Sequence, residues 1–304
     1  MALDDLRYGV GIPQIVEGSA LDIDRLRDML RATEDLGFDS AWIMDASLTA
    51  APSLEPVTTL AFAAAATSSI RLGIGVIVAP LRQPVRLAMD LATVDQLSQG
   101  RLIVGIGLGD RTDRSQAFGV PPDHRVGRVM EGMELIKRLW TEDGVTFTGR
   151  FWQTKDLTAQ PKPFQRPHPP IWFGGGSKPA VERAVRFGDG WMGAGSSTIE
   201  QFKEQAALVR ATLNEAGRDP ATLPIAKRLY IAVSPHRDRG LNRMRAWSRV
   251  FYGNSRMADT AAVVGDLDHC LQKLSEVREA GAGLIVLNPV FDVIDQMQQL
   301  AAAL

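Results

Sequence analysis

The sequence contains a single cysteine, Cys270, among 304 residues. One thiol cannot form an internal disulfide, and disulfide frameworks are typical of small secreted domains, so this count suits a reducing compartment. No apolar run approaches the roughly twenty residues that span a bilayer, and the beginning of the sequence, MALDDLRYG, lacks the apolar stretch of a signal peptide. We therefore expect a cytoplasmic protein that does not enter the membrane.

An excess of charge of one sign is also missing. The 34 basic and 35 acidic residues give a net charge of −1, and both signs are spread along the chain. Nucleic acids and anionic membranes select basic surfaces, so neither is an expected partner. The four histidines show no metal-ligand spacing, and Cys270 lies beside apolar Leu271 on a predicted helix, so no metal site is expected. The histidines are His124, His168, His236 and His269.

Short apolar runs alternate with segments of helical periodicity along the whole chain. Strands are predicted at 7–13, 38–45, 70–80, 101–110, 171–173, 189–193, 223–233 and 283–288. Helices are predicted at 22–37, 56–68, 84–99, 125–140, 179–187, 197–216, 235–251, 266–280 and 290–304. Eight strand-helix units without a break in composition favour an α/β fold, a closed (β/α)8 TIM barrel that forms a single domain over residues 1–304.

Two features complete this outline. Residues 144–152 read as a hairpin, and the proline-rich stretch after them makes about 141–169 an excursion from the repeat. The alternative fold is a pair of Rossmann-like halves, but the glycines at 105, 107 and 109 are not followed by a third glycine at the required spacing.

Two carboxylates, Asp45 and Asp110, end the second and fourth predicted strands. Ligands of parallel barrels bind at the carboxyl ends of the strands, so both residues are candidate catalytic groups. Each could accept a hydrogen bond from a ligand or act as a general base. Capping of the following helix is an equally open interpretation for either residue alone.

The segment Gly174-Gly175-Gly176-Ser177 joins the fifth strand to a helix that begins near Pro179. Glycines expose backbone N–H groups, and the helix N-terminus and the serine hydroxyl add further attraction for an anion. A phosphate site is therefore favoured over a tight turn with no ligand.

Three long stretches of the chain resemble the luciferase-like monooxygenase family. They read IRLGIGVIVAPLRQPVRLAMDLATVDQLSQGRLIVGIGLG, FGVPPDHRVGRVMEGMELIKRLWTEDGVTFTGRFW and PKPFQRPHPPIWFGGGSKPAVERAVRFGDGW. Their wording is similar to the deazaflavin branch of the family, which uses coenzyme F420. The resemblance implies a (β/α)8 barrel, bacterial luciferase-like, that binds a flavin-type ring at its carboxyl-end mouth and usually forms a homodimer.

The resemblance also assigns cofactor-binding positions. It implies a bulge with a non-proline cis peptide at Gly75-Val76 and places Asp45 near the ring. The strand-four contacts match Gly107, Leu108 and Gly109, and the phosphate loop matches Gly174, Gly175, Gly176 and Ser177.

Two positions depart from the deazaflavin dehydrogenases. Ala46 stands where several of those enzymes carry an active-site histidine, and Asp110 replaces their strand-four glutamate. With no histidine available, Asp45 becomes the expected proton relay, and partial burial beside a ring would raise its pKa. The segments 46–55, 111–123 and 251–265 are expected to line the substrate pocket.

Three functions are compatible with these observations. The first is an F420-dependent oxidoreductase that transfers a hydride between the deazaflavin and a small organic substrate. The second is an FMN-dependent monooxygenase that takes reduced flavin from a separate partner reductase. The third, suggested by Ala46, is a cofactor-binding barrel with little catalysis.

Overall fold

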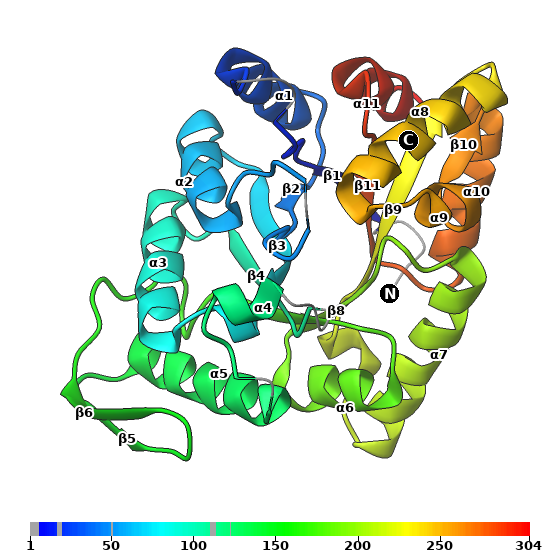
Figure 1. The fold of residues 1–304 in the computed structure, drawn as a ribbon. Coiled ribbons are helices and arrows are strands. Elements are labelled where there is room, and N and C mark those ends of the chain that lie inside the picture. The colour runs from blue at the N-terminus through cyan, green and yellow to red at the C-terminus, as the bar shows by residue number, and fades with distance from the viewer. Residues whose placement is uncertain (1–5, 17–19, 50, 110–113, 122) are drawn as a thin grey trace.

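Eight parallel strands close a barrel in the computed structural model, which describes residues 6–16, 20–49, 51–109, 114–121 and 123–304 (Figure 1). Each strand pairs with its neighbour along the chain, and the circle closes where β1 pairs with β11, β11 with β9 and β9 with β8. The strands are β1 (Arg7–Gly11), β2 (Ser40–Ile43), β3 (Arg71–Val78), β4 (Leu102–Gly107), β7 (Ile171–Gly174), β8 (Gly190–Gly193), β9 (Ile225–Val233) and β11 (Leu284–Asn288). The predicted barrel is confirmed, and the open Rossmann-like alternative is excluded.

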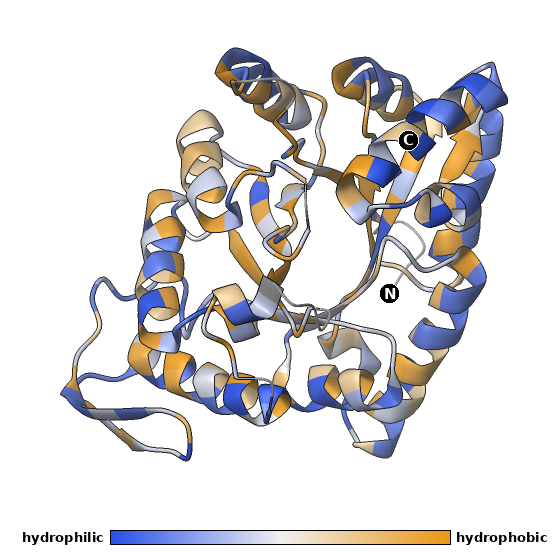
Figure 2. Ribbon diagram, in the orientation of Figure 1, coloured by the Kyte–Doolittle hydropathy of each residue, from blue (hydrophilic) through white to orange (hydrophobic). Residues whose placement is uncertain are grey.

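Helices surround the strands as an outer ring, as Figure 1 shows. They are α1 (Ile23–Asp35), α2 (Pro56–Ala66), α3 (Pro84–Leu97), α5 (Arg125–Thr141), α6 (Lys178–Phe187), α7 (Ile199–Glu215), α8 (Arg237–Tyr252), α10 (Leu267–Glu279) and α11 (Val293–Ala301). Figure 2 shows apolar colours along the strands, while blue polar residues mark the outer helices. The predicted boundaries of α3 hold because Pro84 occupies its first turn and Gly100 follows its end at φ 82°.

Large side chains from alternate strands fill the lower part of the barrel. Trp42 of β2 and Trp172 of β7 lie with their ring centroids 5.5 Å apart. A Cβ added to Gly73 would lie 2.2 Å from the Trp42 ring, so this glycine in β3 leaves the room that the indole needs. The barrel interior around Trp42 and Trp172 is therefore closely packed.

The structure adds elements that the sequence did not predict. No regular element was predicted between residues 252 and 265, but this segment forms α9 (Arg256–Thr260) and β10 (Val263–Gly265), and β10 pairs in parallel with the end of β9 as a ninth strand. Runs this short carry no periodicity. Short helices α4 (Arg114–Ala117), η1 (Ala79–Leu81) and η2 (Pro220–Thr222) also form.

The predicted hairpin forms outside the barrel from β5 (Val145–Thr148) and β6 (Gln153–Leu157). Its second strand begins one residue later than the predicted segment ends. Figure 1 shows the hairpin projecting beyond α3 and α5, as expected for an excursion. Within the part of the chain that the structure describes, no helix has both the length and the apolar character needed to cross a bilayer.

Candidate functional site

A cavity of about 490 Å³ opens at the carboxyl ends of β3, β4, β7, β8 and β9. Eight of the predicted cofactor-binding residues line it: Gly75, Val76, Gly107, Leu108, Gly109, Gly174, Gly175 and Ser177. Gly176 and Asp45 do not. Asp110, the second predicted catalytic residue, lies outside the described residues. The fold thus brings together segments that are a hundred residues apart in the sequence.

The third strand carries the predicted irregularity. Its pairing with β4 shifts register between Ile74 and Ile77, and the Gly75-Val76 peptide bond is cis, so both predictions are confirmed. The Val76 side chain then occupies the space beside two glycines of neighbouring strands. A Cβ would lie 2.4 Å from Val76 at Gly107 and 3.0 Å from it at Gly174. These glycines are needed to pack the bulge, whether or not their backbone also contacts a ligand.

The glycine loop after β7 presents groups that suit an anion. Gly175 has a φ of 113°, and its carbonyl accepts a hydrogen bond of 2.9 Å from the Trp191 indole. Ser177 is the N-cap of α6, and its exposed hydroxyl makes no hydrogen bond within the described ranges. Arg183 lines the cavity from the same helix and forms no ion pair with any residue described. A helix N-terminus, a hydroxyl and a guanidinium therefore converge there.

Gly176 does not line the cavity and instead packs against α7. A Cβ at this position would lie 2.1 Å from the Gln205 side chain of α7. The assignment of Gly174-Gly175-Gly176-Ser177 as a phosphate loop stays a prediction, with Gly175 and Ser177 as its exposed members.

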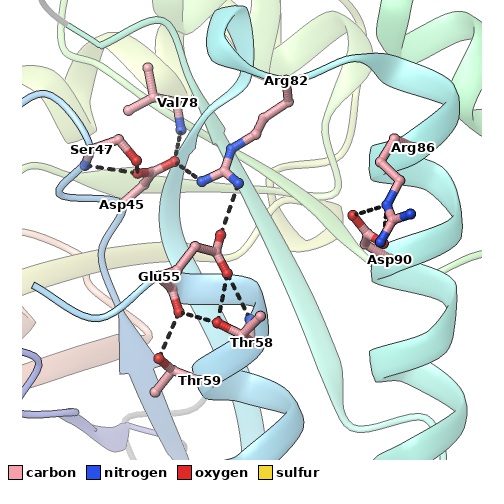
Figure 3. A network of polar contacts seen from close by, with 9 residues as sticks. All are labelled: Asp45, Ser47, Glu55, Thr58, Thr59, Val78, Arg82, Arg86 and Asp90. Carbon is pink, nitrogen blue, oxygen red and sulfur yellow. Dashed lines mark hydrogen bonds and ion pairs between the residues drawn. The ribbon is translucent and has the colours of Figure 1, made fainter. Parts of the chain in front are cut away.

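Asp45 does not line the cavity, and its buried carboxylate belongs to the polar network drawn in Figure 3. Its carboxylate accepts hydrogen bonds from Arg82 at 2.8 Å and from the Val78 backbone N–H at 3.1 Å. Both the backbone N–H and the hydroxyl of Ser47 donate to the other oxygen. Arg82 in turn pairs with Glu55 at 2.8 Å. Asp45 thereby ties the end of β2 to the segment after the bulge.

The expectation of a raised pKa for Asp45 is wrong. Burial raises it, but the hydrogen bonds from Ser47 and the charge and hydrogen bond of Arg82 outweigh burial, and the pKa is lowered. The carboxylate is ionised and fully engaged at neutral pH. The next residue, Ala46, is buried and does not line the cavity. The predicted role of Asp45 as a proton relay therefore loses its physical basis.

The most unusual polar group of the cavity is Arg228, in the middle of β9. The residue is 3% exposed, and its Nη1 donates to Asn288 Oδ1 at 2.7 Å. Its Nε and Nη2 atoms are buried without a partner among the described residues. A Cβ added to Gly75 would lie 3.3 Å from Nη2, so the guanidinium reaches the bulge. Such a cation is costly to bury, and it creates a place for a ligand oxygen.

Its neighbour Lys227 is also fully buried but faces the other side of β9. The ammonium donates to the Ala194 carbonyl and to Ser197, whose carbonyl and hydroxyl lie at 2.7 and 2.8 Å. Residues 193–196 form part of the cavity wall, so Lys227 holds this wall from behind. Burial lowers the pKa of Lys227 to about 7.

Sequence reasoning missed Arg228, although a signal was present. Two adjacent cations interrupt the apolar strand LPIAKRLYIAV, and charged residues inside a buried strand are rare unless they have a role. Arg183 was missed because nothing in its local sequence distinguishes it, whereas Tyr252 belongs to the segment 251–265 that was expected to line the substrate pocket. No cluster of metal-ligating side chains occurs in the described part of the chain.

Known proteins share this architecture and much of this sequence. The family model described as luciferase-like monooxygenase matches residues 10–283. An FMNH(2)-dependent dimethylsulfone monooxygenase of Pseudomonas putida is 32% identical over 67% of this chain and 57% of its own length. An F420-dependent hydroxymycolic acid dehydrogenase of Mycobacterium tuberculosis is 32% identical over 74% of this chain and 63% of its own. The chain thus spans about three fifths of the length of these curated relatives.

Solved structures show the same fold along the whole chain. The monooxygenase RslO1 from Streptomyces bottropensis superposes with a TM-score of 0.82 at 27% identity, and the match covers 98% of both chains. The sequence match covers nine tenths of the chain and includes the bulge, the glycine loop and β9. The chain belongs to the luciferase-like monooxygenase family.

Proposed function

We propose that this protein is an oxidoreductase that binds coenzyme F420 at the mouth of the barrel and transfers a hydride between it and a small organic substrate. The observation that carries the proposal is the composition of the cavity. The cavity combines a bulged strand with glycine backbone, a glycine loop at a helix N-terminus that suits an anion, and the buried cation Arg228. A phosphorylated cofactor with a flat ring needs this combination.

The residues present fit such a cofactor. Gly75, Val76 and Gly107 form the part of the cavity wall that would support the ring. The two glycines have no side chain that would cover the bulge. Gly175, Ser177 and Arg183 would hold the phosphate. Arg228 supplies unpartnered donors for an oxygen of the ring or the substrate. When bound, F420 supplies two-electron hydride chemistry, and the protein contributes binding, orientation and electrostatics.

The choice of F420 is supported by the F420-dependent mycobacterial relative, which covers more of this chain than the FMNH(2)-dependent relative does. It is also supported by the ionisable groups of the cavity. Asp45 does not line it, and among the residues that the structure describes its ionisable side chains are Arg183, Arg228 and Tyr252. Hydride transfer requires only that donor and acceptor be oriented and that one proton be moved at the substrate.

The second candidate is an FMN-dependent monooxygenase served by a partner reductase. It is favoured by the FMNH(2)-dependent monooxygenase of Pseudomonas putida and by the 27% identity to RslO1 along almost the entire chain. The same loop would hold the FMN phosphate. The two candidates differ in the cofactor and not in the site.

Titration of the purified protein with each cofactor decides between them. We expect F420 to bind with quenching of its fluorescence and with at least tenfold higher affinity than FMN. Tight binding of FMN without binding of F420 would overturn the first candidate in favour of the second. Binding of neither cofactor would remove both.

The phosphate loop is tested by comparing FMN with riboflavin, which lacks the phosphate. Arg183→Gln should weaken FMN binding by about tenfold, the usual order for a charge-assisted contact, and leave riboflavin binding unchanged. Arg186→Gln is the matched control, since Arg186 is exposed on the same helix and does not line the cavity. Equal effects of the two substitutions would argue against the phosphate assignment.

A further inference from the structure

The cavity contains a second pair of polar side chains that the proposed cofactor does not use. Tyr252, the last residue of α8, lines the cavity, and its hydroxyl lies 2.8 Å from the hydroxyl of Tyr230. Tyr230 projects from β9 two residues after Arg228 and is fully buried. A Cβ added to Gly195 would lie 2.7 Å from Tyr230 and 3.2 Å from Arg228, so the two side chains are covered by the same loop.

The position of the Tyr252 hydroxyl is fixed by its surroundings. Its ring packs edge-on against Phe251, Trp247 and Tyr230, with centroids 4.9, 6.2 and 6.2 Å away. The chain leaves α8 directly after it through Gly253, which has a φ of 75°. Ser248 donates to the Asn254 carbonyl at 2.7 Å and secures this exit. This aromatic packing fixes the orientation of the phenol ring.

The Tyr230 hydroxyl of this pair holds its proton firmly. Burial, and then the charge and hydrogen bond of Tyr252, raise the pKa of Tyr230 well above its ordinary value. Tyr230 therefore keeps its proton, which it can donate to the Tyr252 oxygen at 2.8 Å or to Met44 Sδ at 3.5 Å. The charge of Arg228 interacts with both phenols and stabilises a phenolate.

We propose that Tyr252, assisted by Tyr230 and Arg228, exchanges a proton with the oxygen of a substrate whose hydride-accepting group is a carbonyl or a double bond conjugated to one. The inference rests on the proposed hydride transfer. It assigns proton transfer to residues of α8 and β9. Asp45 and Ala46, which follow β2, do not perform this step.

The balance of the step follows from these groups. In the reducing direction the carbonyl carbon gains the hydride that the reduced cofactor supplies, and the carbonyl π pair moves to oxygen. The Tyr252 O–H bond breaks, and its proton goes to that oxygen, so the substrate leaves as an alcohol and the cofactor is oxidised. The resulting phenolate, stabilised by Tyr230 and Arg228, regains a proton from water. The oxidising direction reverses each transfer.

Room for the rest of such a substrate lies next to this pair. A second cavity of about 540 Å³ shares Met44 with the first one and is lined by Trp247, which stacks on Phe251. Its wall combines apolar side chains, including Ile15 and Val293, with the charged Asp22, Arg25 and Asp292. We expect the rest of the substrate to occupy this space while its oxygen points toward Tyr252.

The chain offers a clean test because it has three tyrosines, Tyr8, Tyr230 and Tyr252. Ultraviolet titration of the cofactor-free protein near 295 nm counts phenolates as pH rises. Burial raises the pKa of Tyr8 and of Tyr230, so if Tyr252 is the proton donor it should be the first tyrosine to ionise. Tyr252→Phe should abolish this first transition, Tyr230→Phe should move it to higher pH, and Tyr8→Phe, far from the cavity on β1, should leave it in place.

Turnover completes the test, with oxidation of reduced F420 by cyclohexanone and by 2-cyclohexenone as probes. Tyr252→Phe should slow the reaction about 100-fold or more, as expected for loss of a general acid, with cofactor affinity within twofold of wild type. A first transition that persists in Tyr252→Phe, or a rate within threefold of wild type, would overturn the inference. If F420 binds but neither probe reacts, the substrate class is wrong. Failure of wild type to bind F420 would instead contradict the proposed function.

Discussion

Replacement of Asp45 by asparagine tests whether this residue organises the bulge or relays protons. The substitution keeps the shape of the side chain but removes its charge and turns an NH2 group toward donors. The carboxylate is completely buried, and it accepts hydrogen bonds from Arg82, Val78 and Ser47. At least one donor must then face another donor, and Arg82 loses the more buried of its two counterions.

The size of the effect follows from the burial of the pair. Removal of one partner from a buried ion pair costs about 3–5 kcal/mol. Arg82 is 22% exposed and keeps Glu55, so we expect a loss at or just below the lower limit of that range, about 2–3 kcal/mol. With an unfolding entropy of about 2.1 cal/mol/K per residue, such a loss lowers the melting temperature of a chain of this size by about 3–5 °C. Cofactor affinity should fall severalfold because Val78 follows the bulge, while turnover per bound cofactor stays within threefold.

The pH dependence of unfolding provides a second readout. The pKa of Asp45 is lowered in the folded protein from its ordinary value of 3.8, so its stabilising contribution is fully present above that value. It is lost as pH falls through the folded pKa, because only the ionised form keeps the network. The difference between wild type and Asp45→Asn should therefore be constant near neutrality and shrink in acid.

Calorimetry and urea unfolding measure these quantities, and Asp90→Asn is the control. Asp90 pairs with Arg86 on the surface of α3, where Arg86 is 77% exposed, so its loss should cost less than about 1 kcal/mol. This reasoning would be refuted if Asp45→Asn kept the stability and cofactor affinity of the wild type but lost turnover a hundredfold. That result would favour the role of Asp45 as a proton relay.

Three further predictions concern buried groups outside that network. Arg228→Met should fold with unchanged or higher stability, because an apolar side chain replaces a cation without a counterion. Turnover per bound cofactor should fall at least tenfold. A stability loss above about 2 kcal/mol in urea unfolding would show that the charge supports the fold. Lys227 has a folded pKa of about 7 against an ordinary value of 10.5, so between these values the unfolded state binds more protons and stability rises with pH, by at most about 1.4 kcal/mol per unit. Urea unfolding at pH 7.5 and 9.5 should show this rise in wild type and not in Lys227→Met. Burial raises the pKa of the Cys270 thiol to about 11, so a disulfide reagent at pH 8 should label it only after denaturation, and rapid labelling of the native protein would contradict its burial.

The sequence by itself determined the alternation of strands and helices and several of the residues that begin and end these elements. Eight apolar strands, the limits of α3 and the glycine loop before α6 are local features, because each depends on the conformational preferences of residues that are close in the chain. The cis peptide at Gly75-Val76 came from the family resemblance, and the structure confirms it.

The tertiary structure alone decided which side chains enter the cavity. Asp45 is turned toward Arg82, 37 residues away, and this contact lowers a pKa that local reasoning had raised. Arg228 meets Asn288, 60 residues on, and Tyr252 meets Tyr230 across the end of a helix. Burial and pairing of a polar group depend on neighbours that the closing of the barrel supplies. Periodicity predicts which elements form, but it does not reveal which charged side chains will contact one another.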